Sequence, residues 1–206
     1  MRLAPSGRIT LTLPAGTSRK TAERLLRDAS PWLRARLAPV ARQLAAPIPE
    51  TIHLPAVGRT WTVLRRRGAA RMAPADPVLE VGEDDAAAMA ALRAWLKERG
   101  RAWLPGRVER LAKRHGFTYR RVTVRHQRSR WGSCSARGDI SLNCLALLLP
   151  PEAVDHLILH ELCHTRVMDH SPRFWETLAA CQADWRHWDR HLSRAMGELP
   201  LWALPP

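Results

Sequence analysis

Apolar residues near the start of the chain alternate with polar ones. Ile9, Leu11 and Leu13 are separated by threonines, and this period of two predicts a half-buried strand. Residues 17–30 then follow a helical pattern, which ends at a serine–proline pair that can cap and open a second helix over residues 31–45. This part of the chain therefore predicts one strand followed by two helices.

Short strands are predicted next. The runs 59–67 and 78–81 are rich in valine, leucine and threonine and lie among prolines and glycines, a pattern typical of strands. We therefore predict that residues 1–82 form a small α+β portion of the chain.

A helical pattern replaces the strands further along. Apolar side chains recur at helical spacings over residues 84–116, with a break predicted at the proline–glycine pair 105–106. Alternating valines then predict a strand over residues 118–126. The turn-rich run 127–139 predicts a loop, and residues 140–143 predict a second strand.

Two more helices are predicted towards the end of the chain. The Pro-Pro-Glu sequence at residues 150–152 opens one of them, and the Ser-Pro pair at residues 171–172 opens another that runs towards Gly197. We predict that residues 83–198 form a catalytic core and that residues 199–206 form a tail.

Three histidines and one glutamate lie within the eleven residues from His160 to His170. His160 and His164 are four positions apart, so on a helix both rings lie on one face and can bind one metal ion. Glu161 lies about 100° round the helix from His160, close enough to reach a water on that ion but poorly placed to bind the ion itself. This H-E-x-x-H pattern predicts two zinc ligands and a general base.

A catalytic zinc ion usually has three protein ligands. His170 is our candidate for the third. An unbroken helix would carry it about 15 Å along the axis from His160, so the chain must turn back after Arg166. The helix start at Ser171 supports such a turn. Glu176 is the alternative third ligand, because many zinc peptidases take a glutamate from a following helix.

His156 extends the row of His160 and His164 by one helical turn. It would lie about 12 Å along the axis from His164, which is too far to share one ion easily. We therefore expect His156 to pack around the site or to support a ligand.

The balance of charge favours anionic partners. The chain has 33 Lys+Arg against 19 Asp+Glu, a net charge of +14. A basic surface attracts nucleic acids and nucleotides, although an arginine-rich composition can also reflect the base composition of the source genome. The four cysteines form no C-x-x-C pair, and the N-terminus lacks the apolar core of a secretory signal. We expect a cytoplasmic protein with reduced thiols and no membrane span.

Three segments carry motifs of a known family: RSRWGSCSARGDISLN (128–143), LPPEAVDHLILHELCH (149–164) and DHSPRFW (169–175). In this order they resemble the YgjP-like zinc metallopeptidases, relatives of the SprT-like proteases. The resemblance implies an α+β, zincin-like fold of the minimal gluzincin type, with a short antiparallel sheet packed on the H-E-x-x-H helix and on the helix after it. It also implies one Zn²⁺ ion held by His160, His164 and His170, with Glu161 as the catalyst.

Other residues of these segments are candidates for the cleft. Arg130, Ser133 and Asn143 could border it and pair with the backbone of an extended substrate, whereas a purely structural role for this segment is at least as consistent with its tryptophan, glycine and cysteine. Asp169, where the family commonly has a neutral residue, could orient a metal ligand.

Three functions are consistent with these observations. The first is a zinc-dependent hydrolase of peptide bonds acting on a protein or peptide substrate. The second is a metal-dependent hydrolase of nucleotides, which is weakened because the chain has no G-x-x-x-x-G-K-[ST] loop. The third is a basic nucleic-acid-binding module, or a SprT-like protease that associates with DNA.

Overall fold

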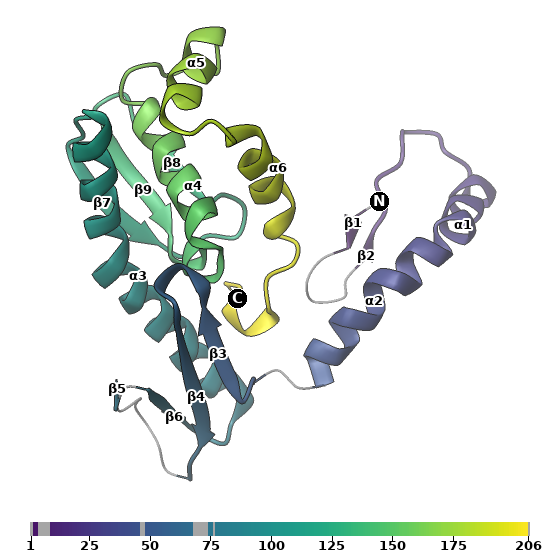
Figure 1. Ribbon diagram of the computed structural model, residues 1–206. Coiled ribbons are helices and arrows are strands. Elements are labelled where there is room, and N and C mark those ends of the chain that lie inside the picture. The colour runs from purple at the N-terminus through teal and green to yellow at the C-terminus, as the bar shows by residue number, and fades with distance from the viewer. Residues whose placement is uncertain (1, 4–8, 46–47, 68–73, 76, 206) are drawn as a thin grey trace. The chain divides into compact units, whose positions relative to one another are not determined.

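The computed structural model describes residues 2–3, 9–45, 48–67, 74–75 and 77–205 (Figure 1). The chain divides into two compact units, Met1–Pro47 and Ile48–Pro206. Helices and strands are mixed within both units, which confirms the α+β class. Among the described residues, none of the helices combines the length and the apolar composition that a membrane span requires.

The first unit contains the predicted strand and the two predicted helices. Its elements are β1 (Arg2–Leu3), β2 (Ile9–Thr10), α1 (Arg19–Asp28) and α2 (Ser30–Ala45). The strand pairs antiparallel with β1 and is shorter than expected, because it ends before Leu11. Ser18 caps α1, since its side chain accepts a hydrogen bond of 3.2 Å from the backbone N–H of Thr21.

A four-stranded sheet begins the second unit. Its strands are β3 (Thr51–Leu54), β4 (Arg59–Arg65), β5 (Pro74–Ala75) and β6 (Val78–Val81), with the 3-10 helix η1 (Pro55–Val57) between β3 and β4. The strand order is β3-β4-β6-β5. β4 and β6 confirm the two predicted strands, and β3 adds an antiparallel neighbour that the sequence did not indicate. Alternate residues of β3 and β4 are buried, so one face of this sheet belongs to the core.

The next element is one unbroken helix, α3 (Asp85–His115). The break expected at residues 105–106 is therefore wrong. An internal proline costs a helix about 3 kcal/mol. Leu96 and Leu104 before Pro105, and Val108 after it, are all completely buried, so packing on both sides of the proline outweighs that cost.

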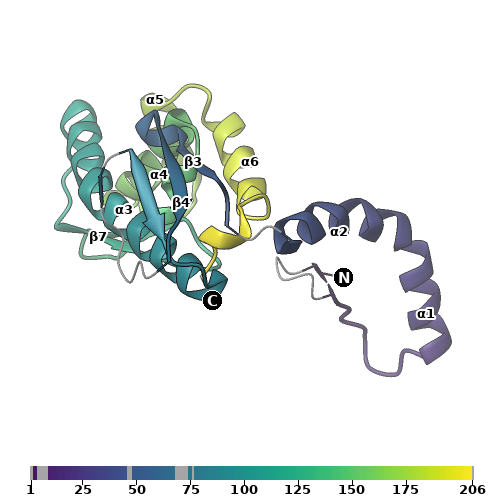
Figure 2. The same cartoon turned by 90° about the horizontal axis from the view of Figure 1, so that it is seen from below.

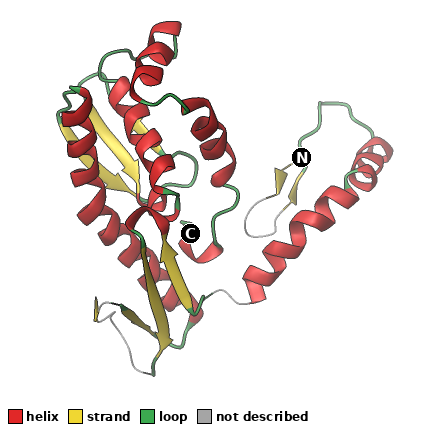
Figure 3. Cartoon of the chain, viewed as in Figure 1, coloured by secondary structure: helices red, strands yellow, loops and turns green. Residues whose placement is uncertain are grey.

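The second sheet is mixed, which corrects the expected antiparallel sheet. Its strands are β7 (Arg121–Arg125), β8 (Gly132–Cys134) and β9 (Asp139–Asn143), in the order β7-β9-β8 (Figure 3). β7 pairs parallel with β9, and β8 pairs antiparallel with β9. A parallel pair needs a connection of a dozen or more residues, which residues 126–138 supply. β8 forms within that connection, in the segment predicted as a loop, and becomes an edge strand.

Three helices complete the second unit. They are α4 (Pro151–Cys163), α5 (Pro172–Cys181) and α6 (Trp185–Ala195), with the 3-10 helices η2 (Cys144–Leu148) before them and η3 (Leu201–Ala203) after them. α4 lies between α3 and α6 in both views (Figures 1 and 2) and also contacts β8. The single helix expected from Ser171 towards Gly197 is in fact α5 and α6. The two are separated because Gln182 has an extended backbone, with φ −148°.

Candidate metal centre

α4 places the H-E-x-x-H residues at its C-terminal end. The helix begins at Pro151, as predicted, and His164 is its C-cap. Leu157, Ile158 and Leu162 are buried and fix the helix in the core. His160 and His164 consequently lie one turn apart on the same side of a helix that cannot easily rotate.

The chain turns back directly after α4, as the sequence predicted. The backbone N–H groups of Thr165 and Arg166 donate to the carbonyls of Leu162 and Cys163, each at 3.0 Å, and close the last turn of the helix. The guanidinium of Arg166 donates to the carbonyl of Gly116 and anchors the turn against the end of α3. α5 then begins at Pro172, so His170 lies between two helices.

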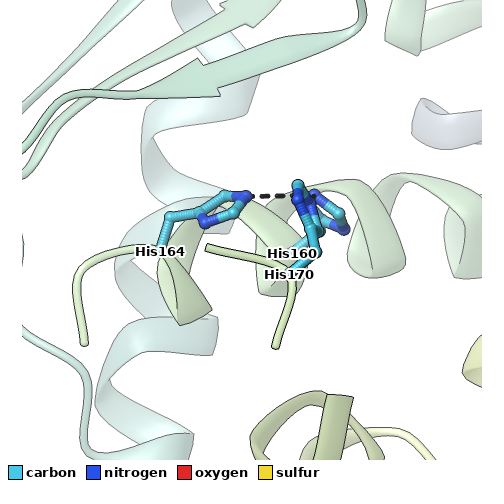
Figure 4. Close-up of side chains that lie close together, drawn as sticks. All are labelled: His160, His164 and His170. Carbon is cyan, nitrogen blue, oxygen red and sulfur yellow. Dashed lines mark hydrogen bonds between the residues drawn. The ribbon is translucent and has the colours of Figure 1, made fainter. Parts of the chain in front are cut away.

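The three histidine rings converge (Figure 4). The Nε2 atom of His160 lies 3.2 Å from Nε2 of His164 and 3.1 Å from Nε2 of His170. Tetrahedral zinc with nitrogens at 2.0–2.1 Å would separate two of its ligands by about 3.3 Å. Among the described residues, these three histidines form a group that could hold a metal ion, and Glu176 is not part of it.

Burial keeps the imidazoles in the form that binds metals. It lowers the pKa of His160 to about 3, with a further decrease from the neighbouring histidines. Burial also lowers the pKa of His164, although a hydrogen bond to Val167 opposes this shift. Nδ1 of His164 donates to the Val167 carbonyl at 3.1 Å, which leaves the lone pair on Nε2. Both rings therefore present unprotonated nitrogens at neutral pH.

Phe174 on α5 supports all three rings. It is completely buried, and its ring centroid lies 4.9 Å from that of His160, 4.6 Å from that of His164 and 4.7 Å from that of His170. The motif after the third histidine thus supports the candidate ligands through packing.

Glu161 lies beside the histidines and is only 5% exposed. Burial raises the pKa of its carboxyl to about 8, and the positive charge of Arg130 acts in the opposite direction. Gly132 on β8 packs directly on this side chain, because a Cβ atom there would lie 2.5 Å from Oε1 of Glu161. A cavity of about 220 Å³ opens next to this carboxyl, and its lining residues are Trp131, Gly132, Leu157, His160, Glu161, Asp189, Leu192 and Ser193.

The remaining candidate residues of the cleft have different surroundings in the structure. Arg130 is exposed two residues before β8, and its charge acts on Glu161. Asn143 has no exposed surface, and its Nδ2 donates to the carbonyls of Gln127 at 2.8 Å and Arg130 at 2.9 Å. Its amide therefore holds the loop before β8. Asp169 is exposed and accepts a hydrogen bond from the backbone N–H of Ser171, ahead of α5.

α6 adds one residue that the sequence did not indicate. Asp189 on α6 lines the cavity together with His160 and Glu161. No local pattern distinguishes this aspartate from the other charged residues of the helix, since its position depends on how α6 packs on α4.

A comparison with protein families agrees with the motifs. The family model described as YgjP-like, metallopeptidase domain, matches residues 1–195. A crystal structure of the metallopeptidase zymogen abylysin from Pyrococcus abyssi is 23% identical to the chain, with a TM-score of 0.39. That match covers 45% of this chain and 90% of the other. A search of curated proteins found no match.

Proposed function

We propose that this chain, which belongs to the YgjP-like metallopeptidase family, hydrolyses peptide bonds with a zinc ion held by His160, His164 and His170 and with Glu161 as the general base. One observation carries the proposal. Three imidazole nitrogens converge at the spacing of tetrahedral ligands, and the buried carboxyl of Glu161 lines the same cavity as one of them, His160.

The donor set fits zinc. The group contains three imidazoles and, among the described residues, no fourth protein ligand. This is the pattern of catalytic zinc sites, which keep one position open. A bound zinc ion supplies a Lewis acid that polarises a carbonyl and lowers the pKa of water towards about 7, together with a positive charge that favours the carboxylate form of Glu161.

Glu161 moves the proton. A carboxylate oxygen of Glu161 accepts a proton from the attacking water while the water oxygen forms a bond to the peptide carbon. It then gives that proton to the amide nitrogen as the carbon–nitrogen bond breaks. The carboxyl is held by burial and by contact with Gly132, so few orientations are open to it. Such restriction favours proton transfer along a fixed path.

The edge of β8 offers a binding surface for an extended peptide. Trp131 and Ser135 make their backbone hydrogen bonds with β9, through the N–H of Asn143 and the carbonyl of Asp139. In an antiparallel ladder this alternation turns the backbone groups of the intervening residues, such as Gly132 and Cys134, away from β9. A substrate strand that paired with them would lie beside Glu161.

Metal content and peptide hydrolysis, measured together, test this proposal. The wild type should bind one zinc ion and hydrolyse a peptide library. Glu161→Gln should keep the zinc and lose about 10²- to 10⁴-fold in rate. Glu152→Gln is the matched control, because Glu152 is an exposed glutamate of the same helix. Zinc-free wild type, or undiminished hydrolysis by Glu161→Gln, would refute the proposal.

A further inference from the structure

α6 brings a carboxylate to the edge of the metal centre. The side chain of Asp189 is 43% exposed and lines the cavity on which His160 and Glu161 also lie. Ligand atoms of Asp189, His156 and His160 all lie within 4.8 Å of one another. This second group shares His160 with the three candidate zinc ligands, so it borders the same site from the side of α6.

The surroundings of His156 indicate that this group lacks a hydrogen-bond donor. It is completely buried, and its Nδ1 lies 2.9 Å from Oε1 of Gln182. An amide oxygen only accepts, so Nδ1 carries the hydrogen and Nε2 carries a lone pair. Nε2 lies 4.0 Å from Oδ1 of Asp189 and has no hydrogen-bond partner in the described part of the chain. Two acceptors thus face each other, and a buried acceptor without a donor is costly.

His160 can supply the donor. Its Nε2 points to His164 and His170, and once that nitrogen holds a metal ion, the ring's only N–H is on Nδ1. Histidine ligands of metals almost always donate this second N–H to a carboxylate or a carbonyl, which fixes the tautomer and the orientation of the ring. His164 already has such a partner in the carbonyl of Val167. The equivalent partner for His160 has to come from another element.

We propose that Asp189 is a positioning residue that accepts the Nδ1–H of His160 and aims its Nε2 at the zinc ion, with Nε2 of His156 as the second acceptor beside it. This inference rests on the proposed function, because it assumes that His160 binds zinc. It makes α6 part of the metal centre although α6 contributes no ligand. The negative charge of Asp189 also makes His160 a more basic ligand.

The zinc dissociation constant of the full chain tests the inference, measured by competition with a chromophoric chelator. Asp189→Ala removes the acceptor and should weaken zinc binding about 10- to 100-fold. Asp189→Asn keeps an oxygen that can accept the bond, so its affinity should lie between those of the wild type and the alanine variant. Glu198→Gln is the matched control, because Glu198 is exposed just after α6, and it should bind zinc like the wild type.

Each outcome decides a different point. If the wild type binds one zinc ion and Asp189→Ala binds it within about twofold of the wild type, the inference is overturned and the proposed function stands. Equal losses in the alanine and asparagine variants, or a similar loss in Glu198→Gln, would also overturn it, because a general change of fold or charge would then explain the result. A wild type that binds no zinc would overturn both proposals.

Discussion

Adding one methyl group at Gly132 should disable the chain while leaving its metal site complete. In Gly132→Ala the new Cβ would lie 2.5 Å from Oε1 and 2.9 Å from Cδ and Cγ of Glu161. Ordinary contact begins near 3.4 Å, so the carboxyl has to move by 0.9 Å, the difference of 3.4 and 2.5 Å. Glu161 is 5% exposed and cannot swing into solvent without disturbing its surroundings.

Such a displacement has two measurable effects. Overpacking of a buried contact costs about 1–3 kcal/mol of stability. A misplacement of about 1 Å in a catalytic group costs about 10²-fold in rate. Peptide hydrolysis, zinc content and urea unfolding of Gly132→Ala should therefore show a large loss of kcat/KM, an unchanged single zinc ion and a moderate loss of stability.

Gly106→Ala provides the comparison. Gly106 lies within α3, and its nearest neighbour to a new Cβ would be Nη1 of Arg110 at 3.7 Å, an ordinary contact. An alanine there should stabilise the helix by about 0.5–1 kcal/mol and leave hydrolysis unchanged. If Gly132→Ala retained full activity, the carboxyl of Glu161 would not need the position described, and its role as general base would be refuted.

Three further predictions follow from the same site. In the metal-free protein, the folded state should hold a proton on Glu161 between about pH 4.5 and 8 that the unfolded state releases. The contribution of Glu161 therefore makes the free energy of unfolding fall as the pH rises through that window. Urea unfolding at a series of pH values should show a steeper fall for the wild type than for Glu161→Gln. Chelation should lower the unfolding temperature, since zinc at 100 times its Kd contributes about 2.7 kcal/mol, and His170→Ala should abolish this difference in calorimetry. Phe174→Ala should cost about 3–5 kcal/mol and reduce zinc content, because the completely buried ring supports all three imidazoles; zinc retained at wild-type affinity would contradict this.

Local chemistry in the sequence predicted the helix starts well. Pro31 in α2, Pro151 in α4 and Pro172 in α5 lie in the first turn of their helices, where a backbone N–H has no partner within the helix. The break at residues 105–106 was wrong for the opposite reason. The proline rule is local, whereas α3 is held by packing against elements far away in the sequence, such as η2, β7 and α4.

Strand pairing also depends on contacts between residues that are far apart in the sequence. Alternating residues predicted β7 and β9 individually, but their parallel pairing depends on the crossover that forms β8 between them. The edge position of β8 and the contact of Gly132 with Glu161 follow from that pairing. Neither could be predicted from a glycine in a polar segment.

The residues of the candidate site also differ in whether local sequence or tertiary packing determines their position. The three histidines could be identified because helical spacing and a helix restart fix their positions within one short segment. Asp189 could not be identified, because its distance from His160 is set by the packing of α6 on α4.

All three candidate ligands lie within eleven consecutive residues, on α4 and on the turn that follows it. An ion bound there closes only a short loop, whereas the buried core also draws on α3 and on both sheets of the second unit. The three histidines therefore contribute little to the packing that holds the second unit together. We expect a chain that has lost His170 to keep its fold and its cavity while losing the ion.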